Sequence, residues 1–211
     1  MRLRLTKGFQ WYLQQIPAAD QDEAVGAAEA LAERLAHLPP GPDQARTLHR
    51  RLSELQEAYL LRRPDLARLV RCGKGCSACC RMWVGITQDE AQLLAQRVRE
   101  GVVIDSRRLA LQAACPDPTS HFQLGPESAR CVFLGRDGAC RVHEDRPSAC
   151  RLVLVASDPA LCATADFQTR IAAVIAPDAE LLASAALSAC PAQGDGGLSL
   201  ARGLHAALQE P

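Results

Sequence analysis

The chain has 211 residues, of which 48% are hydrophobic and only 4% aromatic, so we expect a core of Leu, Ala and Val in packed helices rather than a sandwich or barrel. Lys plus Arg and Asp plus Glu balance at 24 each, which excludes the positive field that nucleic acid binding needs. The N-terminus does not resemble a signal peptide and no uninterrupted apolar run reaches the ~18 residues of a membrane helix, so we expect a cytoplasmic bacterial protein with no membrane contact.

Two amphipathic helices are predicted near the N-terminus. Within residues 22–38, apolar side chains recur at three- and four-residue steps until the breaker at residues 39–42, Pro-Pro-Gly-Pro. A second apolar stripe covers residues 45–59 and ends before Pro64. We expect these helices to form an antiparallel pair across the proline turn, so that residues 1–70 make an N-terminal helical segment.

The central part of the chain, residues 71–155, is predicted to hold one clear helix and one long loop. Thr87 is a suitable N-cap with Glu90 three residues later, so a helix should begin directly after Thr87. Residues 116–130 contain Pro, Asp, Ser and Gly with little periodicity, and we interpret them as a loop with a short strand at 121–124.

Apolar periodicity returns after the central part of the chain. Residues 152–155 should begin a helix or a buried segment, and helices are predicted over 167–175, 179–187 and 198–208. We therefore interpret residues 156–211 as a helical C-terminal segment packed on the same domain.

The ten cysteines carry the chemical information, because a dense cysteine pattern in a reducing compartment indicates metal or redox chemistry rather than disulfides. Four of them fall within Cys72-Gly-Lys-Gly-Cys76-Ser-Ala-Cys79-Cys80, where glycines and small residues let the backbone curl around a bound atom. Cys79 and Cys80 are adjacent, so their side chains should start in different directions. One could be a ligand while the other packs, or the two could bind different irons or different centres.

A second cysteine group follows about fifty residues later. Strand-like runs flank residues 135–138, Gly-Arg-Asp-Gly, a hairpin turn signal that would bring Cys131 and Cys140 together. Pro147 suits the first turn of a helix, which would place Cys150 near a helix N-terminus. There the helix dipole favours a thiolate, so Cys150 should ionise more readily than a free cysteine.

The order and spacing of these residues resemble the YkgJ-type cysteine-cluster family, described as a zinc- or iron-chelating domain. The resemblance covers roughly residues 70–155 and includes Phe133-Leu134, Val142 and Arg146-Pro147 beside the cysteines. His143 occupies a place that is often Tyr in the family, and the Phe-Pro expected after Arg151 is missing, but neither departure removes a sulfur.

The resemblance extends to a later element and to function. Cys190-Pro191 resembles a Cys-Pro-Gly element of many members, although Ala192 stands in the place of Gly. Most members imply metal binding alone, whereas a branch similar to flagellin lysine methylases implies a protein-modifying enzyme. The predicted metal ligands are Cys72, Cys76, Cys79, Cys80, Cys131, Cys140, Cys150 and Cys190.

We favour an iron–sulfur cluster over zinc, because these cysteines exceed what one tetrahedral zinc needs. Two zinc ions, or one zinc with spare thiols, would use the same residues. Cys115 and Cys162 are interpreted as ordinary small residues, His143 as a bystander, and His49 as a satisfied or surface residue.

Three functions compete for such a chain: a metal-binding module that recognises a protein partner or delivers metal, a cluster-dependent modifying enzyme, and an electron carrier. Whether it is an enzyme stays open, and no catalytic residue is predicted. The expected fold is mainly α, an irregular helical domain around a metal-nucleated, loop-rich cysteine centre with a short β-hairpin.

Overall fold

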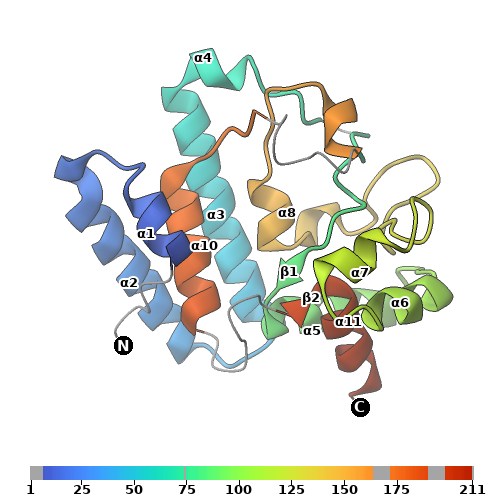
Figure 1. Cartoon of the computed structure of the whole chain (residues 1–211). Helices are drawn as coiled ribbons and strands as arrows, with labels where there is room; N and C mark the ends of the chain where they lie inside the picture. The colour runs from blue at the N-terminus through green and yellow to red at the C-terminus, as the bar shows by residue number, and fades with distance from the viewer. Residues whose placement is uncertain (1–6, 74, 164–171, 190–197, 211) are drawn as a thin grey trace.

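A computed structural model describes residues 7–73, 75–163, 172–189 and 198–210 (Figure 1). The elements in chain order are α1 (Lys7–Leu13), the 3-10 turn η1 (Ala18–Asp20), α2 (Gln21–His37), α3 (Pro42–Arg62), α4 (Pro64–Ala67), β1 (Gly85–Ile86), α5 (Gln88–Arg99), α6 (Ser106–Ala113), α7 (Pro118–Phe122), the 3-10 turn η2 (His143–Asp145), α8 (Ser148–Leu152), the 3-10 turn η3 (Pro159–Ala163), α10 (Pro177–Ala189), β2 (Leu198–Ser199) and α11 (Leu200–Gln209). The fold is mainly α, as predicted. Among the described residues, no helix is both long and apolar enough to cross a membrane.

The two predicted N-terminal helices are present as α2 and α3. Buried Leu31 and Leu35 lie on one face of α2, and buried Leu48 and Leu52 lie on one face of α3. The two helices run in opposite directions, and α10 lies between them (Figure 1). Helix α2 packs mainly against α10, whereas α3 packs against both α10 and α5. The two helices are antiparallel and contact each other, but they share less packing with one another than with α10, because the Ala- and Leu-rich α10 supplies a more apolar partner surface than either helix offers the other.

The hydrophobic core consists of two clusters. The first is formed mainly by α2, α3 and α10, and its largest residues are Leu31, Leu35, Leu48, Leu52, Leu152, Leu181 and Leu182. The second is formed by α5, α6, α11 and the second cysteine segment, and its largest residues are Ile86, Leu94, Leu109, Phe133, Leu200 and Leu204. The two C-terminal helices therefore divide between the clusters, α10 joining the first and α11 the second.

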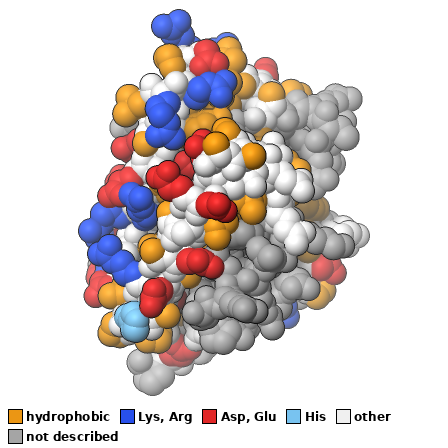
Figure 2. Space-filling model, turned by 90° about the vertical axis from the view of Figure 1, so that its left-hand side faces the viewer, with side chains coloured by type: hydrophobic (Ala, Val, Ile, Leu, Met, Phe, Trp, Pro, Cys, Tyr) orange, Lys and Arg blue, Asp and Glu red, His pale blue; other side chains and the backbone are white. Residues whose placement is uncertain are grey.

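The surface over the N-terminal side of the molecule mixes acidic and basic side chains rather than separating them (Figure 2). Exposed ion pairs such as Arg46–Asp43 and Arg51–Glu54 join neighbours three residues apart on α3. Pairs of this kind contribute little to stability because water screens them.

The small sheet pairs residues that are far apart in the sequence. Gly85 of β1 lies opposite Ser199 of β2, and Ile86 lies opposite Leu198. The chain turns into α11 directly after β2, where the Ser199 side chain accepts a hydrogen bond from the Arg202 amide. The predicted helix over 198–208 is thus confirmed except for its first two residues, which form the strand.

The predicted hairpin in the second cysteine group is shorter than expected. Its turn is present, since the Gly135 amide donates to the carbonyl of Ala139 at 2.8 Å, but only one bridge, between Leu134 and Cys140, flanks it. Gly138 closes the turn with φ +77°, a conformation that favours glycine.

Three local predictions were wrong or incomplete. The expected strand at 121–124 is instead the end of α7, which Asp117 caps by accepting a hydrogen bond from the Ser120 amide at 2.8 Å. Helix α6 was not predicted, because its eight residues carry too short an apolar stripe. Residues 172–175 are extended where a helix was expected, with Ala173 bridged to Val155; the rest of that prediction lies outside the described residues.

A buried carboxylate joins three helices at the boundary between the two core clusters. Glu90, 1% exposed, closes the predicted capping box of α5, its Oε2 accepting from the Thr87 amide at 2.8 Å. Its Oε1 accepts from Nε2 of His49 on α3 at 2.8 Å, and from the amide and hydroxyl of Ser148 on α8 at 2.7 and 2.6 Å. His49 is thus a buried structural partner at 3% exposure.

The same contacts keep Glu90 ionised. Burial is the largest single influence on its pKa and would raise it, but the hydrogen bonds and charge of His49, together with the Ser148 contacts, leave the pKa below its ordinary value. A carboxylate this deep in the protein is tolerated only because each oxygen is hydrogen-bonded.

We predict that Glu90→Ala lowers the free energy of unfolding by about 3 kcal/mol or more, because it leaves the buried donors of His49 and Ser148 without an acceptor. Urea unfolding of the variant beside Glu100→Ala, which removes an exposed carboxylate at the end of the same helix, measures this. A loss no larger than that of the control would contradict the prediction.

The contribution of Glu90 should also depend on pH. Because its folded pKa lies below the ordinary value, the stabilisation is complete above the ordinary carboxyl pKa and is lost as the pH falls through the folded pKa. The difference in unfolding free energy between the wild-type protein and Glu90→Gln, measured from neutral pH into acid, should therefore shrink toward low pH. A difference that stays constant or grows in acid would be incompatible with this.

Candidate metal centre

The first cysteine group lies on a loop made of successive tight turns. The Cys76 amide donates to the Gly73 carbonyl, and the Cys80 amide donates to the Ser77 carbonyl, both at 3.0 Å. Gly75 has φ +85°, which a residue with a Cβ rarely adopts. The glycines and small residues of this segment therefore allow the curl that the sequence predicted.

Backbone contacts bring the second cysteine group against this loop. The Cys131 amide donates to the Cys80 carbonyl at 2.7 Å, so one residue of each group is in direct contact. On the neighbouring turn, a Cβ added to Gly138 would lie 3.4 Å from the Gly75 carbonyl oxygen. The two groups, about fifty residues apart in sequence, are therefore adjacent in space.

The chain that follows Cys150 closes the other side of the loop. The Arg71 amide donates a hydrogen bond to the Val155 carbonyl at 2.8 Å. The Val155 amide in turn donates to Sγ of Cys72 at 3.3 Å. Amide donation to sulfur is a common feature of thiolate sites because it stabilises negative charge on the sulfur.

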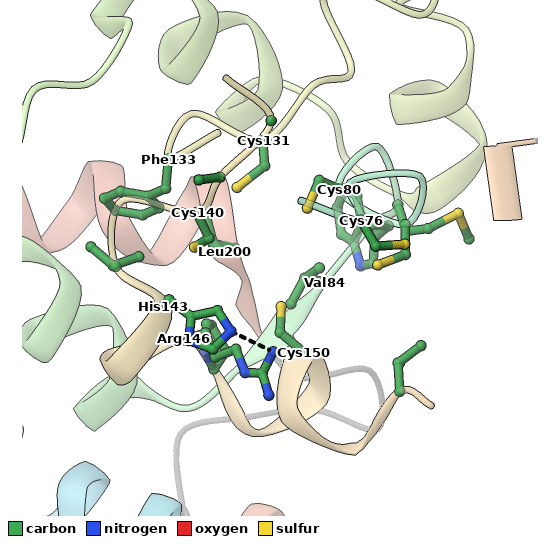
Figure 3. A pocket seen from close by; sticks show the side chains of 18 of the residues that line it. Cys76, Cys80, Val84, Cys131, Phe133, Cys140, His143, Arg146, Cys150 and Leu200 are labelled. Atoms are coloured by element: carbon green, nitrogen blue, oxygen red, sulfur yellow. Dashed lines mark hydrogen bonds between the residues drawn. The ribbon is translucent and has the colours of Figure 1, made fainter. Parts of the chain in front are cut away.

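Seven of the eight predicted ligands line one pocket with a volume of about 690 Å³ (Figure 3). Cys131, Cys140 and Cys150 approach it from the turn and from α8, and the loop with Cys76 and Cys80 faces them across the space (Figure 3). The seven cysteines are Cys72, Cys76, Cys79, Cys80, Cys131, Cys140 and Cys150. Cys190, the eighth, lies outside the described residues.

The thiols line one pocket, but they are not arranged as the ligands of a single metal ion. Among the described residues, no group of three or more His, Cys, Asp or Glu side chains is arranged so that it could hold a metal ion. The cysteines of the described residues are all free of disulfides. The donor set, seven soft sulfurs around one space, fits zinc or iron, whereas the spacing requires the sulfurs to draw together around what they bind.

Burial favours the protonated form of four of the pocket thiols when no cation is bound. It raises the pKa of Cys131 to about 11, and it is also the largest cause of the raised pKa of Cys150, Cys140 and Cys72. The expectation that Cys150 ionises readily was therefore wrong, because burial and the neighbouring thiols outweigh the N-terminus of the short helix α8. A bound cation reverses this balance, since a coordinating thiol loses its proton.

Cys79 and Cys80 differ from the sequence expectation. Their side chains do not separate, because both line the pocket and a side-chain hydrogen bond between them is the largest cause of the raised pKa of Cys79. Both sulfurs of the adjacent pair therefore face the same space and are available to one centre.

Other residues near the pocket were missed or underestimated by sequence reasoning. Buried His121 lies 3.1 Å through Nε2 from the Arg81 carbonyl and stacks edge-on against Trp83, which lines the pocket. Arg146 places a positive charge that favours the thiolates of Cys72, Cys79 and Cys140. A lone histidine carries no such signal in the sequence, since the contact between His121 and Arg81 joins residues forty positions apart.

The cysteines outside the predicted ligand set behave differently from each other. Cys115 is buried, lies 3.6 Å from the Leu111 carbonyl and is not part of the pocket wall. Cys162 is also buried, but it is near enough to Cys72, Cys76 and Cys79 for their charges to contribute to its raised pKa, after burial itself.

Comparison with known proteins agrees with this geometry. Residues 71–171 match the family model CxxCxxCC, which is described as "Putative zinc- or iron-chelating domain". The matched segment contains all seven pocket cysteines. No curated protein and no solved structure matches the chain.

We predict that metal affinity rises with pH beyond the range of an ordinary thiol. Binding must release protons from thiols whose pKa burial has raised, to about 11 for Cys131, so ionisation is incomplete even at the ordinary thiol value of 9.0. Zinc binding in competition with a chelator, measured from neutral pH to about pH 10, should strengthen throughout. A plateau below the ordinary thiol value would contradict the raised pKa values.

Proposed function

We propose that this chain is a metal-binding protein whose pocket cysteines hold an iron–sulfur cluster. The observation that carries the proposal is the number and kind of donors: seven thiols from three chain segments line one pocket. A tetrahedral zinc uses four ligands, whereas a cluster takes thiolates over a wider space because its own sulfides bridge the irons.

The spacing of the thiols supports a centre larger than a single ion. Around one zinc with Zn–S distances of about 2.3 Å, neighbouring sulfurs lie about 3.8 Å apart. The described thiols are spread around about 690 Å³ and no three of them are arranged to hold one ion.

We further propose that the centre belongs to a metal-binding module that recognises a protein partner or holds metal for delivery. An electron carrier would use the same cluster. The second candidate, a cluster-dependent modifying enzyme, is favoured by one observation: the pocket wall includes Trp83, Phe133 and Leu200, which offer no metal ligand and suit an organic molecule.

We predict that anaerobically purified protein is brown, with broad visible absorption and with iron and acid-labile sulfide in matching amounts. Cys150→Ala should lose most of this iron, because Cys150 faces the pocket, whereas Cys115→Ala should keep it, because Cys115 lies outside the pocket wall. Elemental analysis and visible spectra measure both.

A colourless protein with stoichiometric zinc would contradict the proposal of an iron–sulfur cluster and would support zinc as the bound metal. Equal metal loss in both variants would mean that the loss follows from general destabilisation of a buried cysteine rather than from ligation. Thermal unfolding of each variant, recorded beside the metal content, separates these two causes.

A further inference from the structure

The pocket lining is not made of thiols alone. Apolar side chains, among them Trp83, Val84, Phe133, Val142 and Leu200, also line it, and Val84, Phe133 and Leu200 lie close to the cysteines (Figure 3). These groups cannot coordinate a metal, but they match the apolar lining of sites that bind small organic molecules. The volume of about 690 Å³ also lies within the range of about 300–1,000 Å³ that is typical of such sites.

One positive charge in the pocket lining has no acidic partner. Arg146 lines the pocket, and no ion pair joins it to a carboxylate within the described ranges. Its neighbour Asp145 is paired with Arg97 instead, and the Glu144 side chain is 94% exposed. The charge of Arg146 therefore lacks an acidic partner among these residues.

The hydrogen bonds of Arg146 are also incomplete. Nη1 lies 3.2 Å from Nε2 of His143, which orients the guanidinium toward the pocket beside Cys150 (Figure 3). The Nε atom is buried and has no hydrogen-bond partner among the described residues. Arg130 also has a buried Nε without a partner, but its terminal nitrogens contact Glu127 and the Gly135 carbonyl, and it does not line the pocket.

From this arrangement we propose that the pocket binds a small organic carboxylate, with the acid group on Arg146 and an apolar body against Trp83 and Val84, both of which line the pocket and are partly exposed. A guanidinium is the side chain best suited to a carboxylate, because its parallel N–H groups match the two oxygens. The proposal rests on the proposed function, because the ligand would lie beside the metal centre in the same pocket. In a metal-dependent enzyme, this ligand would occupy the place of a substrate.

The position of the two tryptophans allows a direct test. The chain has two tryptophans, and Trp11 lies on α1 at 47% exposure, outside the pocket lining. Metal-loaded full-length protein carrying Trp11→Phe therefore reports on the pocket through Trp83 alone. Titration with hexanoate should give a saturable change in Trp83 emission, while the neutral hexanamide and inorganic phosphate should bind at least tenfold more weakly, and calorimetry should give the same order.

Variants of two arginines distinguish recognition of the carboxylate by Arg146 from a general effect of nearby positive charge. Compared in samples matched for metal content, Arg146→Met should weaken hexanoate binding at least tenfold, and Arg146→Lys, which keeps the positive charge beside the thiols, should recover part of the affinity. Arg136→Met, which removes an exposed arginine from the adjacent turn, should have no effect. Equal binding of hexanoate and hexanamide, or no saturation with either, would overturn the proposal.

Metal analysis of the same samples separates this proposal from the one before it. If Arg146→Met loses the metal together with hexanoate binding, Arg146 balances the charge of the metal centre and the carboxylate site is refuted. If the wild-type protein holds no metal yet binds hexanoate through Arg146, the metal proposal fails and the carboxylate site stands.

Discussion

The structure depends on one buried carboxylate. Glu90 is almost fully buried, and its oxygens accept hydrogen bonds from the N-cap of its own helix, from His49 on α3 and from Ser148 on α8. A charge in that position is stable only with all of these donors in place, so it fixes the three helices relative to one another. Cys150 follows Ser148 by two residues on α8, and its thiol faces the pocket. By holding Ser148, Glu90 therefore helps to position Cys150, although Glu90 does not line the pocket.

Contacts within the protein bring the two cysteine groups together without the help of a bound cation. The Cys131 amide contacts the Cys80 carbonyl, and residues of the second group, including Phe133 and Val142, belong to a hydrophobic cluster with α5 and α11. Burial in turn makes the thiolate form of Cys131 and Cys150 costly, and it is the largest cause of the raised pKa of each. Metal binding and ionisation are therefore coupled, and the bound cation supplies the charge that the apolar surroundings do not.

Arg146 connects the metal chemistry to the apolar wall of the pocket. Its charge acts on thiols of both cysteine groups, and its guanidinium has a buried donor without a partner. The match of residues 71–171 to a model described as a zinc- or iron-chelating domain accounts for the sulfurs. It does not account for an aromatic and aliphatic surface beside them, and that surface is what makes a binding role for an organic molecule physically reasonable.

The sequence alone determined the features that arise from neighbours along the chain. Helices α2 and α3 follow from apolar residues at helical spacing, α5 from the Thr87–Glu90 capping box, and the turn before Cys140 from its glycines. The short helices α6 and α7 were not predicted, because so few residues show little helical periodicity. Only the tertiary structure decided that α10 separates α2 from α3, that β1 pairs with β2, that His49 contacts Glu90, and that Cys150 resists ionisation. Each of these depends on burial and on contacts between residues far apart in the chain, which local spacing does not encode.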